Sequence, residues 1–123
     1  MTYRQKLPPS LDSIDSVGIW ARDIAQTERP ELASDAERMA RALVSAAIRR
    51  TGQSEYIGTR IEVSDDSLRI EVHDPGGCDY TGGFETAELS SATTSFGASI
   101  DRNGHRAWVI LRRRREARHG RGE

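Results

Sequence analysis

The stretch SDAERMARALVSAAIRR, residues 34–50, decides the fold class of this chain. Its apolar residues recur every three or four positions, as on one face of an amphipathic helix. These residues are Ala36, Met39, Ala40, Leu43, Val44, Ala47 and Ile48. Asp35 and Glu37 lie in the first turn, where the helix dipole favours acidic side chains, and Arg49 and Arg50 lie in the last turn. The pattern predicts a helix with one buried face that ends before Gly52.

Two further elements are expected on the N-terminal side of this helix. Residues 2–7 alternate weakly between polar and apolar side chains and predict an edge strand that stops at Pro8. Residues 11–27 carry apolar side chains at helical spacing and follow Ser10, a candidate N-cap, so they predict a first helix. Pro30 separates the two helices because proline interrupts helical hydrogen bonding.

On the C-terminal side the pattern changes from helix to strand. Alternating or continuous apolar residues predict four strands, at residues 57–64, 67–74, 96–100 and 106–111. The turn at Asp65-Asp66 joins the first two as a hairpin, and Asn103-Gly104 is a strong signal for a second tight turn. The last strand is expected inside the sheet because its apolar run is continuous. Residues 84–94, after a pair of glycines, predict a weaker third helix.

Because helices and hairpins segregate along the chain, we predict an α+β fold. It is expected to be a two-layer α/β sandwich, with a mostly antiparallel five-stranded sheet and three helices on one face. The 123 residues suit one domain, which we place at residues 1–111. Residues 112–123 hold six arginines and two glutamates, a net charge of +4, and are expected to form a basic, disordered tail.

Composition restricts the cellular setting. No apolar run approaches the roughly 18–20 residues of a membrane span, and the N-terminus lacks the pattern of a signal peptide. The single cysteine, Cys78, excludes an internal disulfide and a cysteine-cluster metal site. We therefore expect a cytoplasmic protein with no membrane partner.

Four segments, taken in order, carry a family resemblance. They are ELASDAERMARALVSAAIRRTG (31–52), LRIEVHDPGG (68–77), FG (96–97) and NGHRAWVIL (103–111). Together with the N-terminal strand and first helix they resemble the GHKL, or histidine-kinase-like, ATPase family. Within that family the chain is most similar to small bacterial anti-sigma-factor serine kinases and to the short "ATP-binding protein" regulators. The resemblance covers about residues 4–111 and implies a Bergerat-type sandwich.

The resemblance also implies the location of a nucleotide site. Such a site needs a carboxylate to accept a hydrogen bond from the adenine amino group, oxygen ligands for Mg²⁺, and backbone N–H groups around the phosphates. Asp74 matches the adenine-reading aspartate, and Gly76 matches the glycine that follows it. Gly77, Gly82 and Gly83 are the remaining candidate nucleotide-binding residues. Without the resemblance, Asp74 would read as a strand-end residue before a Pro-Gly-Gly turn.

Three positions depart from the family pattern. The Mg²⁺-binding asparagine falls on Ala46, the general-base glutamate on Ala42, and the threonine that supports adenine on Arg106. Alanine can neither bind a metal nor move a proton, so we expect no catalytic residue and no metal site. The position near Asp74 where adenine would bind is then empty, filled by the protein's own side chains, or used for another small ligand. An ion pair between Arg106 and Asp74 is one form of the second alternative.

The remaining chemistry-bearing residues have structural interpretations. Trp20 and Trp108 lie on apolar faces and are expected in the core. His73, His105 and His119 show no metal-ligand spacing and are expected at the surface or in turns.

The preferred hypothesis is a non-catalytic regulatory protein-interaction module with a degenerate nucleotide site and no cofactor. Its expected partner is a transcriptional regulator, a sigma factor or an antagonist protein. Because the similar proteins dimerise along the N-terminal strand and first helix, residues 2–7 and the exposed side of residues 11–25 are candidate interfaces for a homodimer or a partner. One alternative is an active serine/threonine protein kinase that binds ATP and Mg²⁺. Another is a nucleic-acid-binding adaptor that acts through the arginine-rich tail.

Overall fold

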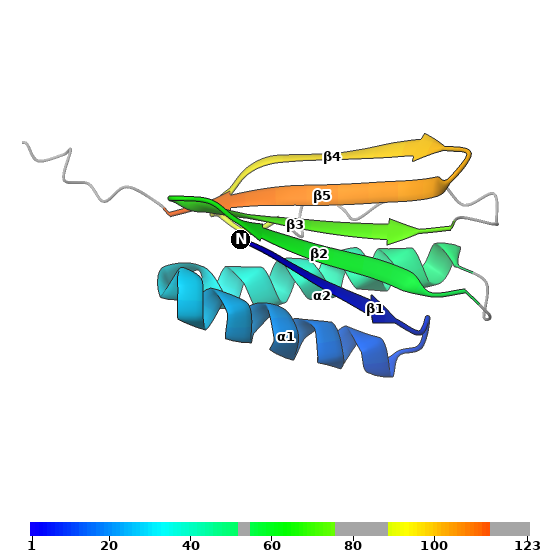
Figure 1. The fold of residues 1–123 in the computed structure, drawn as a ribbon, viewed down its shortest axis with the longest axis horizontal. Helices are drawn as coiled ribbons and strands as arrows, with labels where there is room; N and C mark the ends of the chain where they lie inside the picture. Colours follow the sequence, from blue (N-terminus) through cyan, green and yellow to red (C-terminus); the bar gives the residue numbers. More distant parts are fainter. Residues whose placement is uncertain (52–54, 76–88, 114–123) are drawn as a thin grey trace, which may run out of the picture.

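The computed structural model describes residues 1–51, 55–75 and 89–113. Its elements are β1 (Thr2–Leu7), α1 (Asp12–Glu28), the short 3-10 helix η1 (Pro30–Leu32), α2 (Ala33–Arg50), β2 (Ile57–Val63), β3 (Ser67–Asp74), β4 (Thr93–Asp101) and β5 (Gly104–Arg112). All neighbouring strands pair antiparallel, in the order β1-β2-β3-β5-β4. Both long helices lie on one face of this sheet (Figure 1). The α+β class, the two layers and the five-stranded antiparallel sheet are therefore confirmed.

The core lies between α2 and the helix-facing side of the sheet. Alternate residues of each strand point to opposite faces, so β3 places Leu68, Ile70 and Val72 in the core. From the helix side, fully buried Met39 and Leu43 belong to the same apolar cluster. The apolar face of α2 that the sequence predicts is thus the side that packs against the strands.

The third predicted helix is not confirmed. Residues 84–88 lie outside the described ranges, and residues 89–94 are not helical. The hydroxyl of Ser90 accepts a hydrogen bond from the Ala92 backbone N–H at 3.1 Å, which forms a turn. Thr93 and Thr94 then begin β4, because β-branched side chains fit a pleated strand better than a helix. This strand is longer than the one predicted at residues 96–100.

Two smaller predictions about element ends are also wrong. Ser10 does not cap α1: Leu11 holds the N-cap position without a side-chain hydrogen bond, while the Ser13 hydroxyl donates to the Pro8 carbonyl at 2.6 Å. At the other end, β5 continues to Arg112. Arg113 forms an ion pair with Glu31 at 3.2 Å. The rest of the predicted tail, residues 114–123, lies outside the described residues.

The two tryptophans have different surroundings. Trp20 is half-buried and packs against the core, as predicted. Trp108 does not: it lies on the face of the sheet opposite the helices, because the inward positions of β5 are His105, Ala107, Val109 and Leu111. There its ring stacks under the Arg69 guanidinium at 4.8 Å.

The position of β5 between β3 and β4 confirms the prediction that the last strand is internal. Among the described residues, no helix is long and apolar enough to cross a membrane.

Candidate functional site

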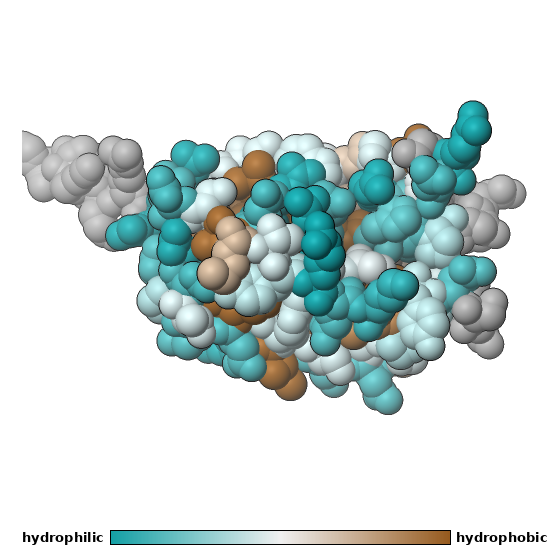
Figure 2. All heavy atoms as spheres, viewed as in Figure 1, coloured by the Kyte–Doolittle hydropathy of each residue, from teal (hydrophilic) through white to brown (hydrophobic). Residues whose placement is uncertain are grey.

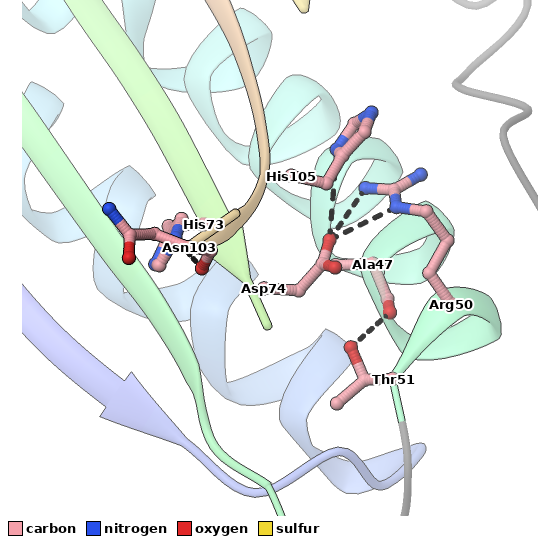
Figure 3. Close-up of polar contacts among 7 residues, drawn as sticks. All are labelled: Ala47, Arg50, Thr51, His73, Asp74, Asn103 and His105. Carbon is pink, nitrogen blue, oxygen red and sulfur yellow. Dashed lines mark hydrogen bonds and ion pairs between the residues drawn. The ribbon is translucent and has the colours of Figure 1, made fainter. Parts of the chain in front are cut away.

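The candidate site is centred on Asp74, the last residue of β3. Its carboxylate points to the helix side of the sheet and is completely buried. Directly across the ladder lies His105 of β5. Figure 3 shows Asp74, His105 and Arg50 converging at this end of the sheet. The strand-end position of Asp74 agrees with the one that the sequence predicted.

Arg50, in the last turn of α2, is the partner of this carboxylate. Its Nε lies 3.0 Å and its Nη2 2.9 Å from the same oxygen of Asp74, Oδ2. The Arg50 side chain is only 2% exposed. A buried carboxylate is tolerated in a protein interior when a charged, hydrogen-bonding group lies against it, and the guanidinium supplies both.

Sequence reasoning missed the role of Arg50, although a signal was present. We interpreted both arginines at the end of α2 as cations at the helix C-terminus. Residue 50, however, continues the buried series of positions 36, 40, 43 and 47, each three or four residues from the last, whereas Arg49 is exposed. A buried arginine on the apolar face of a helix needs a buried anion as its partner, and Asp74 is that anion.

His105 is the second residue that we misplaced. It is 4% exposed and lies beside Asp74, not in a surface turn. Its Nδ1 lies 3.8 Å from Asp74 Oδ2, which is too long for a hydrogen bond, and among the described residues this nitrogen has no hydrogen-bond partner. Burial, followed by the positive charge of Arg50, lowers the pKa of His105, while the charge of Asp74 acts in the opposite direction. His105 is therefore held as the neutral imidazole at neutral pH.

Arg106 does not form the ion pair with Asp74 that we considered. It is the neighbour of inward-facing His105, so its side chain points to the opposite face of the sheet. On that face its Nε lies 3.4 Å from Glu71 Oε2. The arginine that lies against the Asp74 carboxylate is therefore Arg50 of α2 and not Arg106 of β5.

The other predicted positions fall around the same corner or outside the described residues. Ala46 is buried one helical turn before Arg50, and Ala42, one turn earlier, is half-buried against the core. Neither side chain offers an oxygen or nitrogen to a metal ion or a proton. Gly76, Gly77, Gly82 and Gly83 lie outside the described residues. Over the described ranges no group of three His, Cys, Asp or Glu side chains is placed to hold a metal ion.

Gly104 fixes the backbone on which this corner depends. It follows the turn between β4 and β5 with a φ of +124°, a conformation suited to glycine. A Cβ atom at this position would lie 2.1 Å from the Asp74 carbonyl oxygen. The absence of a side chain lets the second hairpin pack directly against the end of β3.

Two of the positions that the resemblance assigns to nucleotide binding carry other chemistry here. Adenine recognition needs an acceptor on Asp74, and Arg50 already engages Oδ2 with two nitrogens. At the metal position, Ala46 has no oxygen ligand to give. The chemistry that this arrangement does support is a neutral, buried ion pair that joins α2 to the end of β3.

Comparison with known proteins adds no family assignment. No protein-family model matches this chain, and no curated protein matches it at a significant level.

Proposed function

We propose that this protein is a non-catalytic regulatory module of the cytoplasm, similar to anti-sigma-factor kinases in fold but with a degenerate nucleotide site. The observation that carries the proposal is the buried ion pair between Arg50 and Asp74. The residue assigned by resemblance to adenine recognition is here part of the internal structure. Ala42 and Ala46 strengthen the case, since neither can supply a base or a metal ligand.

The proposed activity is protein binding, with a transcriptional regulator, a sigma factor or an antagonist as the partner. The described part of the face drawn in Figure 2 is mainly hydrophilic, and its hydrophobic residues form small separate spots. We therefore place the interface at an edge of the molecule. β1 is an edge strand, paired on one side with β2 alone, and such strands can accept another strand.

The exposed side of α1 is the second candidate surface. The Tyr3 hydroxyl donates a 2.5 Å hydrogen bond to Glu28, which ties β1 to the end of α1. Along α1, Ile19 is 61% exposed. A surface isoleucine on this helix suits either a second copy of this chain or a partner protein.

The alternative is an active ATP-binding serine/threonine protein kinase. The placement of Asp74 at the inward-facing end of β3 favours it, because this is the location that the resemblance implies. The two functions differ in one requirement. A kinase needs Mg²⁺-dependent ATP binding that discriminates adenine, whereas the regulatory module does not.

The interface is tested by sedimentation equilibrium of the wild type and two aspartate variants. We expect a dimer, and we expect Ile19→Asp to weaken it at least about tenfold, since a buried isoleucine contributes about 1.5–3 kcal/mol. Ile100→Asp is the matched control: Ile100 is 64% exposed and lies on β4, at the opposite edge of the sheet. A monomeric wild type, or equal effects of the two variants, would contradict a homodimer formed through this interface.

A further inference from the structure

A groove of about 440 Å³ lies on the face of the sheet opposite the helices. Its charged lining residues are Arg4 and Lys6 of β1, Arg60 of β2, Glu71 of β3 and Arg106 of β5. Four cations and one carboxylate give this lining a net charge of +3. All five lie on the side away from the Asp74 corner, because alternate strand residues face opposite ways.

The cations of β1 and β2 lie close enough to repel one another. Arg4 and Arg60 are direct cross-strand partners, and like charges in that arrangement repel. Lys6, two residues along β1, adds a third positive charge on the same face. Neither Arg4 nor Lys6 forms an ion pair with any described residue, and the nearest carboxylate to Arg60, on Glu62, is 3.7 Å away. An anion in the groove would relieve this repulsion.

Glu71 does not supply that anion. Its Oε1 accepts from Arg69 Nη2 at 3.0 Å, and its Oε2 faces Arg106 Nε at 3.4 Å. Both oxygens of the carboxylate are therefore directed to arginines on the β3 and β5 side. Arg4 and Lys6 therefore gain no ion pair from Glu71, and Arg60 has only the 3.7 Å contact with Glu62.

The floor of the groove is open because of a glycine. Gly58 pairs with Lys6 on one side and with His73 on the other, and it belongs to the same face as Arg60. A Cβ atom there would meet nothing closer than the His73 carbonyl oxygen, at 3.9 Å. A larger side chain at this position would project into the groove without straining the fold.

We propose that this groove binds a small molecule that bears phosphate groups. The guanidinium group of arginine can donate two parallel hydrogen bonds to the oxygens of one phosphate. A phosphate group, with a charge near −2, also complements this excess of cations better than a single carboxylate does. The volume lies within the range of about 300–1,000 Å³ that is usual for small-ligand sites. This site is separate from the Asp74 corner and does not depend on it.

The test is calorimetric titration of the full chain with pyrophosphate and with ADP at low salt. We expect both to bind, and we expect Lys6→Gln to weaken binding about tenfold through the loss of one charge-assisted contact. Gly58→Val should abolish binding while the protein stays folded. Arg38→Gln is the matched control, because it removes the same charge from an exposed position on α2.

The two probes also separate the possible sources of the phosphate. Equal affinities mean that the groove recognises the phosphates alone, and tighter ADP binding assigns an organic phosphate. Binding should persist in a variant that replaces both Arg50 and Asp74, so failure at the groove is distinguishable from failure of the regulatory proposal. The inference is overturned if neither probe binds or if binding survives Gly58→Val.

Discussion

Arg50→Met is expected to lower the free energy of unfolding by about 3–5 kcal/mol, as is typical when one member of a buried ion pair is removed. The substitution takes away the guanidinium that lies 2.9–3.0 Å from Asp74 Oδ2 and leaves the buried carboxylate behind. Asp74→Leu should cost a similar amount for the converse reason. Denaturant unfolding monitored by circular dichroism measures both effects.

The double variant tests whether these two losses have one cause. Because a buried ion pair can be replaced by apolar side chains with little net loss, Arg50→Met combined with Asp74→Leu should be more stable than either single variant. Arg22→Gln is the control, since it breaks the half-exposed ion pair with Glu37 and should cost less than about 1 kcal/mol. Additive losses in the double variant would mean that the two side chains do not stabilise each other.

Gly104→Ala is expected to destabilise the protein by about 3 kcal/mol, because strain in the backbone and a steric clash act together. The φ of +124° is costly for any residue with a Cβ atom, and that atom would lie 2.1 Å from the Asp74 carbonyl oxygen. Thermal and denaturant unfolding give the magnitude.

Gly58→Ala is the matched comparison for this substitution. The chemical change is identical, but Gly58 lies within a regular strand and its nearest neighbour would be 3.9 Å from the new methyl group. Its stability should be unchanged or higher by up to about 1 kcal/mol, since glycine is unfavourable within a strand. Similar losses at the two positions would show that the close approach of Gly104 to β3 is not what fixes the corner.

The arrangement of the sheet and of both long helices was predictable because it follows from local patterns. The apolar spacing in residues 34–50 places α2 on the sheet, and alternation in residues 57–74 gives the hairpin. The third predicted helix is different, since residues 89–94 carry a weak apolar pattern that includes two threonines suited to a strand. There the hydrogen bonds with β5 decide the conformation, and those are not local.

The candidate site was predictable only in part. The resemblance located Asp74, and alternation along β3 directs it to the helix side. The partner was not found, because whether Arg50 or Arg106 reaches the carboxylate depends on how α2 packs against β3. Neighbouring residues of a strand face opposite sides of the sheet, so the inward position of His105 on β5 excludes Arg106 as the partner of Asp74. The helical pattern predicts a buried side chain at position 50, but the role of its charge follows only once Asp74 is known to lie beside it.

We propose that Asp74 is a structural ion-pair partner of Arg50 and does not read adenine. The most direct test compares the binding of ATP and GTP by calorimetry, with and without Mg²⁺, in the wild type and in the Gly58→Val protein, whose new side chain projects into the groove. We predict equal affinities for ATP and GTP in the wild type, no dependence on Mg²⁺, and no heat from either nucleotide at about 1 mM in Gly58→Val. ATP binding that is at least about tenfold tighter than GTP binding, requires Mg²⁺ and persists in Gly58→Val would contradict the account and favour the kinase.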